Sequence, residues 1–345
     1  MAQFTSGSPA ARLGKLKGDI LKHAVPAEVL GMCGQQRQIP KNSGLTVVHR
    51  RYLPYGASAA NANSINRPKA DPANHMLIEG VTPQADSLTP QDISVTLKQY
   101  GCLYQLTDVV ADTYEDDVPA EMKKQTGERI ALVREMIRYG VLKACTNVFY
   151  AGGGSSRATV SKNIELKLLR KISRNLQANH AKRITGVLDA GPKIATRPVE
   201  AAYVVFVHTD AEADIRDLEG FTHTSEYGTR TPISPYELGS CENFRFVTTP
   251  ELSPYLDAGA LIGSTGLTGD TKVDVYPFIM VGEDAYGQVA LRGVNSIDPT
   301  YIAPGVKDKS DPLGQRGYVG AKFYMECTML NEGWMAVAEA GVTAL

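Results

Sequence analysis

The chain has 345 residues, 43% of them hydrophobic, and its 36 Lys and Arg residues balance its 37 Asp and Glu residues to a net charge of -1. This composition is typical of a folded soluble protein of more than one compact region, and it disfavours a dedicated nucleic-acid-binding domain, whose isoelectric point usually exceeds about 9. The longest apolar run, residues 201–207, is too short to span a bilayer, and the N-terminus lacks the apolar core of a secretory signal peptide, so we expect no membrane partner and folding in a reducing cytoplasm.

Residues 1–44 have the composition of an arm. They carry six basic residues against two acidic ones and offer one short amphipathic stretch, residues 13–21. Because such a segment cannot bury enough apolar surface by itself, we expect it to become ordered against a neighbouring chain or molecule.

Two segments with alternating apolar and polar residues, 45–53 and 93–106, predict strands. Between them lie 39 residues rich in Pro, Gly, Asn, Ala and Ser and nearly free of large apolar residues. Connections longer than about 12 to 15 residues are uncommon in compact domains. The sequence therefore predicts a long loop that projects on a two-stranded stem.

The strongest helix signal in the chain begins near Val118, where Pro119 suits a first helical turn. We expect Gly152 to Gly154 to end this helix, which at roughly 30 residues would be about 45 Å long and would act as a strut. Its apolar stripe has spacings of three and four residues and comprises Met122, Thr126, Ile130, Val133, Ile137, Val141, Ala144 and Val148.

The rest of the chain alternates between strand and helix signals. Residues 163–183 predict a helix, residues 201–208 a strand buried on both faces, and residues 209–221 a short helix capped by Thr209 or Asp210. The alternation over 318–342 predicts one long terminal strand. Together these elements indicate an α/β or α+β fold, and the α+β alternative is the one that agrees with the resemblance described below.

Catalytic and metal-binding signatures are weak. Residues 152–157 and 266–272 are Gly-rich but lack the spacing and flanking elements of a nucleotide-binding loop. His208, at the end of the buried strand and before Asp210, is the best catalytic candidate, and a satisfied polar group is the better interpretation. We therefore expect no enzyme, no cofactor and no metal.

The five cysteines lie at least 43 residues apart, so they form no metal-binding pair. Their ordinary interpretation is as small buried hydrophobes, with an intersubunit disulfide in an extracellular particle as the alternative.

Positive charge gathers in two places, and such runs are usually solvated faces. If these faces line a compartment that holds packed DNA, they would make sequence-independent phosphate contacts. The candidate DNA-facing residues are Arg12, Lys15, Lys17 and Lys22 in the arm and Lys167, Arg170, Lys171 and Arg174 in the second helix.

The order of arm, strand, long loop, strand, strut helix, mixed domain and terminal strand resembles the Hong Kong 97-type fold of tailed-bacteriophage major capsid proteins. Local segments, including VVHRRYLP at 47–54, LIEGVTPQADSLTPQDISVTLKQYG at 77–101, LTDVVADT at 106–113, GVLKACTNVFYAGG at 140–153 and the terminal AKFYMECTMLNEGWMAVAE, are similar to the podovirus N-four-type family. The resemblance covers most of the chain.

The resemblance implies a division of the chain into functional parts. These are an N-terminal arm at 1–44, an extended loop (E-loop) with its strands at 45–106, the spine helix of a peripheral domain at 107–154, an axial domain at 155–300 and a return to the peripheral domain at 301–345.

It also implies pentamers and hexamers of identical subunits in the icosahedral shell of a virion, assembled in the host bacterial cytoplasm as a metastable procapsid. The implied partners are a scaffolding protein, a portal protein, a decoration or cement protein and packaged double-stranded DNA. We predict no covalent crosslink, because no partner asparagine or activating glutamate can be identified for Lys69. The candidate intersubunit contacts are Arg50, Arg51, Tyr52, Lys69, His75 and Glu79.

Three other functions are weighed against this one. A nanocompartment (encapsulin-like) shell protein would have the same fold and hold no DNA. An α/β enzyme would centre on His208 and Asp210, and a nucleic-acid-binding module would use the helix at 162–183. Neither of the last two accounts for the long loop.

Overall fold

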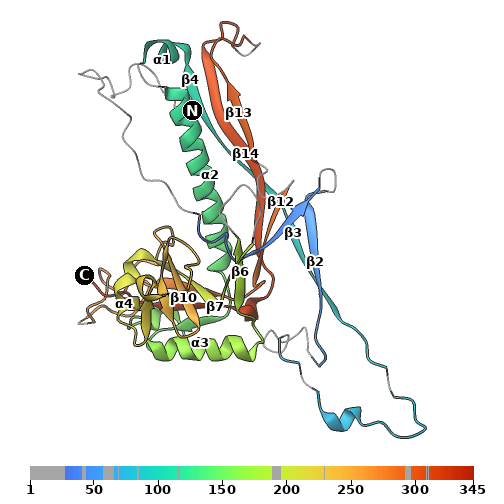
Figure 1. Cartoon of the computed structure of the whole chain (residues 1–345). Coiled ribbons are helices and arrows are strands. Elements are labelled where there is room, and N and C mark those ends of the chain that lie inside the picture. Colours follow the sequence, from blue (N-terminus) through green and yellow to red (C-terminus); the bar gives the residue numbers. More distant parts are fainter. Residues whose placement is uncertain are drawn as a thin grey trace.

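The computed structural model describes residues 28–40, 44–56, 66–68, 70–83, 85–114, 117–188, 196–228, 230–263, 265–291, 297–307, 309 and 311–345. Figure 1 shows a sheet-and-helix body, a long helix lying beside long strands, and a loop that extends away from both. The strands form an eight-stranded sheet, a five-stranded sheet and a separate two-stranded sheet.

The eight-stranded sheet is the centre of the body. Its strands follow the order β5 (Val148–Tyr150), β15 (Met335–Ala340), β11 (Tyr276–Val281), β7 (Thr196–His208), β10 (Phe244–Thr249), β9 (Glu237–Cys241) and β8 (Phe221–His223), and β6 (Ile184–Leu188) also pairs with β7. Strand β7 pairs in parallel with β10 and antiparallel with β11, so the sheet is mixed.

Helices cover both faces of this sheet, so β7 is buried on both faces, as its apolar run predicted. Tyr203, Val205 and Val207 lie in one core with the buried face of α3 (Leu166–Ala178). Val204 and Phe206 lie in a second core with the C-terminal end of α2 (Val118–Leu142). Alternate residues of one strand thus anchor two helices, because successive side chains of a strand point to opposite faces.

The spine helix α2 forms as predicted but is shorter. It has 25 residues, and Asp117 caps its start by accepting a hydrogen bond from the backbone N–H of Ala120. The chain leaves the helix after Leu142 and enters β5, whose Val148 pairs with Val337 of β15. The prediction that Gly152 to Gly154 end the helix is therefore wrong, since this glycine run follows a strand.

The buried stripe of α2 also differs from the predicted one in its second half. Met122, Thr126 and Ile130 are buried as expected, and Ile130 packs against Phe323 of the long strand β14 (Arg316–Met329). Farther along, the buried residues are Glu135, Arg138, Tyr139 and Leu142, while the expected Ala144 is exposed.

The five-stranded sheet runs beside α2. Strand β14 pairs with β4 (Lys98–Thr107) along one edge and with β13 (Asp298–Ile302) and β12 (Tyr286–Leu291) along the other. The N-terminal β1 (Gln35–Ile39) adds to β12 in parallel. Residues 28–40, which belong to the predicted arm, therefore pack on the body of their own chain.

Two segments predicted as single strands are each divided between two sheets. The tail forms β14 and β15, separated by the 3-10 turn η5 (Glu332–Trp334). Residues 93–106 fall in β3 (Pro90–Thr96) and β4, which part at Leu97. Leu97 is buried and its N–H donates to the carbonyl of Leu45, so the break is a packed corner between two sheets.

The remaining helices are short. They are α1 (Asp108–Thr113), α4 (Glu212–Arg216), η1 (Pro72–His75), η2 (Arg157–Thr159), η3 (Thr209–Ala211) and η4 (Thr224–Glu226). The predicted cap at Thr209 or Asp210 is wrong, because the side chain of His208 accepts the capping hydrogen bond from Asp210. Among the described helices, none is both long and apolar enough to cross a membrane.

Candidate assembly surfaces

The predicted loop rises on a two-stranded stem made of β2 (Thr46–Tyr52) and β3. Arg50 and Asp92 face each other across the stem, and two hydrogen bonds of 2.7 Å join the guanidinium of Arg50 to the carboxylate of Asp92. These hydrogen bonds raise the pKa of Arg50 and lower that of Asp92. The guanidinium of Arg50 is therefore paired within its own chain.

Three side chains attach the base of the loop to the body. Nη1 of Arg51 donates to the carbonyl of Leu330 over 3.2 Å. Nδ2 of Asn66 donates to Oδ1 of Asn331 over 2.8 Å, and Nε of Arg67 donates to Oδ1 of Asn179 over 2.9 Å. The loop thus leaves the body from a fixed direction.

The far end of the described loop exposes a group of large apolar side chains. Met76, Leu77, Ile78 and Val81 are 79%, 74%, 69% and 60% exposed. A tight turn holds them together, since the N–H of Val81 donates to the carbonyl of Ile78 and Gly80 takes a φ of 78°. We call these four residues the apolar knob. Exposed apolar groups of this size mark interaction surfaces.

The six residues predicted to make intersubunit contacts differ in their surroundings. Arg50 and Arg51 bind groups of their own chain, while Tyr52, His75 and Glu79 are exposed. The ring of His75 lies edge-on against that of Tyr55, with 5.1 Å between their centres. Lys69 lies outside the described residues.

Sequence reasoning missed the apolar knob because it treated the loop as nearly free of large apolar residues. The signal was present in the run of Met76, Leu77 and Ile78, three consecutive apolar residues in an otherwise polar segment.

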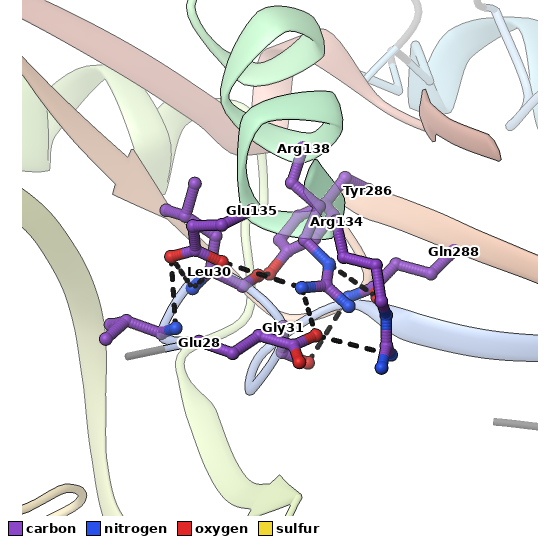
Figure 2. Close-up of polar contacts among 9 residues, drawn as sticks. Glu28, Leu30, Gly31, Arg134, Glu135, Arg138, Tyr286 and Gln288 are labelled. Carbon is purple, nitrogen blue, oxygen red and sulfur yellow. Dashed lines mark hydrogen bonds and ion pairs between the residues drawn. The ribbon is translucent and has the colours of Figure 1, made fainter. Parts of the chain in front are cut away.

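A second unpredicted feature fastens the N-terminal segment to α2, and Figure 2 shows its polar contacts. Oε1 of Glu135 accepts hydrogen bonds from the backbone N–H groups of Val29 and Leu30, over 3.0 and 2.9 Å. Nη1 of Arg138 forms ion pairs with Glu28 and, over 3.5 Å, with Glu135. We call Glu28, Glu135, Arg138 and Gln288 the clamp.

Gln288 of β12 completes the clamp from the five-stranded sheet. Its Oε1 accepts from Nε of Arg138 over 2.9 Å, and its Nε2 donates to the carbonyl of Gly31 over 3.2 Å. A Cβ on Gly31 would lie 3.0 Å from Cζ of Arg138, so the backbone passes close to the guanidinium. The clamp therefore ties residues 28–31, α2 and β12 into one unit.

Three members of the clamp, Glu135, Arg138 and Gln288, are buried, and the side chains of Glu135 and Arg138 are each 1% exposed. Glu28 is exposed. Burial raises the pKa of Glu135, while its hydrogen bonds to Leu30 and Val29 and the charge of Arg138 lower it. Removing one partner from such a network leaves an uncompensated buried charge, which is costly.

The basic residues predicted on the second helix share one exposed face of α3. Lys167, Arg170, Lys171 and Arg174 are exposed, whereas Leu169, Ile172 and Leu176 are buried against the sheet. Arg170 forms an ion pair of 2.7 Å with Glu242. The basic residues predicted in the arm (Arg12, Lys15, Lys17 and Lys22) lie outside the described residues.

The candidate catalytic pair has a local structural role. Nδ1 of His208 accepts a hydrogen bond from the N–H of Asp210 and lies 3.2 Å from Oδ2 of that residue. The hydroxyl of Tyr276 donates to the same carboxylate over 2.9 Å. These contacts cap η3 and join it to β11.

Within the described ranges, neither the cysteines nor the other residue types that commonly bind metals form a further candidate site. All five cysteines are free, and Cys145, Cys241 and Cys327 are buried, as the sequence predicted. The same prediction is wrong for Cys33 and Cys102, which are only partly buried. Burial raises the pKa of Cys145 to about 11 and that of Cys327 to about 12, so both thiols stay protonated. Among the residues that the structure describes, no cluster of His, Cys, Asp and Glu has metal-binding geometry.

No family model matches the sequence. A curated relative, the major capsid protein of Pseudomonas phage KPP21, is 19% identical over 262 residues, which make up 70% of this chain and 65% of the relative. The chain therefore spans just under two thirds of that relative's length.

Solved phage capsids match the whole architecture. The capsid of Ralstonia phage GP4 aligns with a TM-score of 0.62 and 12% identity over 100% of this chain and 99% of that one. The capsid of cyanophage Pam1 aligns with a TM-score of 0.62 and 13% identity over 100% of both chains. The capsid of cyanophage P-SCSP1u aligns with a TM-score of 0.61 and 11% identity over 96% of this chain and 93% of that one. The chain has the fold of phage capsid subunits, the α+β Hong Kong 97-type fold that the order of its elements predicted.

Proposed function

We propose that this chain is a phage major capsid protein, which assembles with copies of itself into the head shell of a virion and catalyses no reaction. The observation that carries the proposal is the long loop, whose apolar knob is exposed on a two-stranded stem. A monomer gains little from such a loop, whereas a subunit that must grip its neighbours uses it as a contact. The fold and the curated relative support the same function.

The parts of the chain follow from this proposal. We propose that the segment before residue 28, the loop and α2 act as arm, E-loop and spine, that residues 155–300 supply the axial domain around each pentamer and hexamer, and that residues 301–345 return to the peripheral domain. Assembly takes place in the host bacterial cytoplasm, with a scaffolding protein, a portal protein and a decoration or cement protein as partners.

The basic face of α3 supports a contact with packaged DNA. Lys167, Lys171 and Arg174 are exposed together, and Arg170 adds a fourth cation beside Glu242. Exposed cations bind phosphates without reading sequence, and such binding weakens as salt rises. We propose that this face lines the interior of the shell.

The test of the proposed function is assembly itself. The chain, expressed with its scaffolding protein, should give closed shells in electron micrographs and a matching particle size in light scattering. A chain that stays monomeric at high concentration with its scaffold would overturn the proposal. DNA protected from nuclease inside shells purified from phage-infected cells separates a phage head from a nanocompartment, whose shells would contain none.

A variant that lacks residues 55–90 tests whether assembly depends on the loop. The deletion removes the knob and the contacts of Asn66 and Arg67 while keeping the body, so the shortened chain should fold and fail to close shells. A shortened chain that still closes shells would show that the loop makes no essential contact.

A further inference from the structure

A cavity of about 460 Å³ lies between the loop stem and the body. His49, Tyr52 and Ile93 line it from the stem. Leu330 and Trp334 line it from the body, beside the hydrogen bonds that attach the base of the loop. An apolar cavity of about 150 Å³ can hold a benzene molecule, so this one has room for several apolar side chains.

The cavity is positively charged. Arg37, Arg50 and Arg51 line it, and Asp284 is the single acidic residue among its described lining residues. Arg50 is neutralised by Asp92, but Arg51 donates to the neutral oxygens of Gln91 and Leu330. An occupant that carries negative charge is therefore favoured.

His49 lines the cavity from the stem. Its side chain lies on the stem, the residue is 7% exposed, and Nε2 has no hydrogen-bond partner among the described residues.

The apolar knob has the complementary properties. It places four large apolar side chains at one turn, and Glu79 lies within that turn. Residues 71–88 carry three acidic residues and no Lys or Arg. The four knob residues are at least 60% exposed and none of them lines the cavity, so the knob does not fill the cavity of its own chain.

We propose that the cavity receives the apolar knob of a second copy of this chain, with Glu79 of the knob close to Arg37 and Arg51 of the cavity. This inference rests on the proposed function. Knob and cavity are different surfaces of one chain, so the contact is head-to-tail, and such contacts join identical copies into rings when the rotation closes. Every copy then supplies one knob and one cavity.

Cysteine crosslinking between two singly substituted chains tests the contact directly. Chains with Ile78→Cys in the knob and chains with Leu330→Cys in the cavity wall are mixed, assembled with the scaffolding protein and oxidised. Because each chain carries one new cysteine, a disulfide between positions 78 and 330 joins different copies. We expect a disulfide-linked dimer on a non-reducing gel, absent when either variant is oxidised alone.

The matched control replaces Leu330→Cys by Leu261→Cys, which places a thiol at another exposed apolar residue of the body. Shells that form without the knob-cavity crosslink, or with an equal crosslink to position 261, would overturn the inference and leave the proposed function standing. Failure of the unaltered chain to form shells would overturn both. If Leu330→Cys prevents assembly, Tyr52→Cys on the stem side of the same cavity takes its place.

Discussion

The sheet between α2 and α3 and the loop between β2 and β3 place their apolar side chains in opposite environments. In the body, Ile172, Phe206 and Phe278 are fully buried between sheet and helices. In the loop, the four residues of the apolar knob are at least 60% exposed. Burial stabilises the subunit by itself, whereas an exposed knob gains free energy only when another surface covers it.

Charged residues show the same contrast between a buried body and an exposed loop. The clamp holds Glu135 and Arg138 away from water within a network that reaches three segments of the chain. The stem holds Arg50 and Asp92 in an ion pair open to solvent. Buried pairs are costly to break, and exposed pairs contribute little, so the two regions should respond very differently to substitution.

The largest expected effect is in the clamp. Arg138→Met removes the guanidinium that pairs with the buried carboxylate of Glu135, while Glu28 keeps its ion pair with Arg134, and it should lower the free energy of unfolding of the unassembled subunit by about 3 to 5 kcal/mol. Denaturant unfolding measures it. Arg170→Met is the matched control, because its ion pair with Glu242 is exposed to solvent and should contribute little to the free energy of unfolding. Equal losses of stability in the two variants would contradict the claim that the buried clamp contributes more than an exposed ion pair.

A slightly smaller loss of stability is expected from a substitution in the core under α3. Ile172→Ala leaves a cavity beneath the sheet and should lower the free energy of unfolding by about 2 to 4 kcal/mol, measured by the same unfolding experiment.

Leu77→Ala in the knob should change the free energy of unfolding of the free subunit by no more than about 0.5 kcal/mol, since surface substitutions rarely exceed that. A large loss from Leu77→Ala would mean that the knob already packs within its own chain.

The smallest effect concerns a charged turn of the body. Oδ1 of Asp257 accepts hydrogen bonds from the N–H groups of Lys272, Thr271 and Asp270, and these bonds lower the pKa of its carboxyl. A folded pKa below the unfolded value means that the ionised carboxylate stabilises the fold above about pH 4 and that this stabilisation is lost as the pH falls through the folded pKa. Asp257→Asn should therefore lower Tm slightly at neutral pH and leave it unchanged in acid. If Asp257→Asn still has a lower Tm than the unaltered chain in strong acid, the ionised carboxylate is not the source of the stabilisation.

The elements with continuous periodic signals could be predicted from the sequence, and the breaks between them could not. The stem, α3 and β7 form where the pattern of apolar residues placed them, and α2 does so over its first half but ends at Leu142, before its predicted end. The division at Leu97 and the separation of β14 from β15 depend on which sheet each half joins, which is a tertiary choice that leaves no local signal.

The clamp escaped prediction for a related reason. Glu135 and Arg138 look like ordinary solvent-facing residues of a helix until residues 28–31 and Gln288 cover them. The knob was different, because its apolar run is visible in the sequence and was outweighed by the polar composition around it.

Hydrogen exchange in free subunits and in assembled shells, followed by mass spectrometry, tests the central claim most directly. The backbone of residues 76–88 should exchange rapidly in the free subunit and slowly in the shell. The strands β7 and β11 should be protected to the same degree in both states, because their core is complete in one chain. Equal and rapid exchange of residues 76–88 in both states would contradict the claim that the loop is covered by assembly.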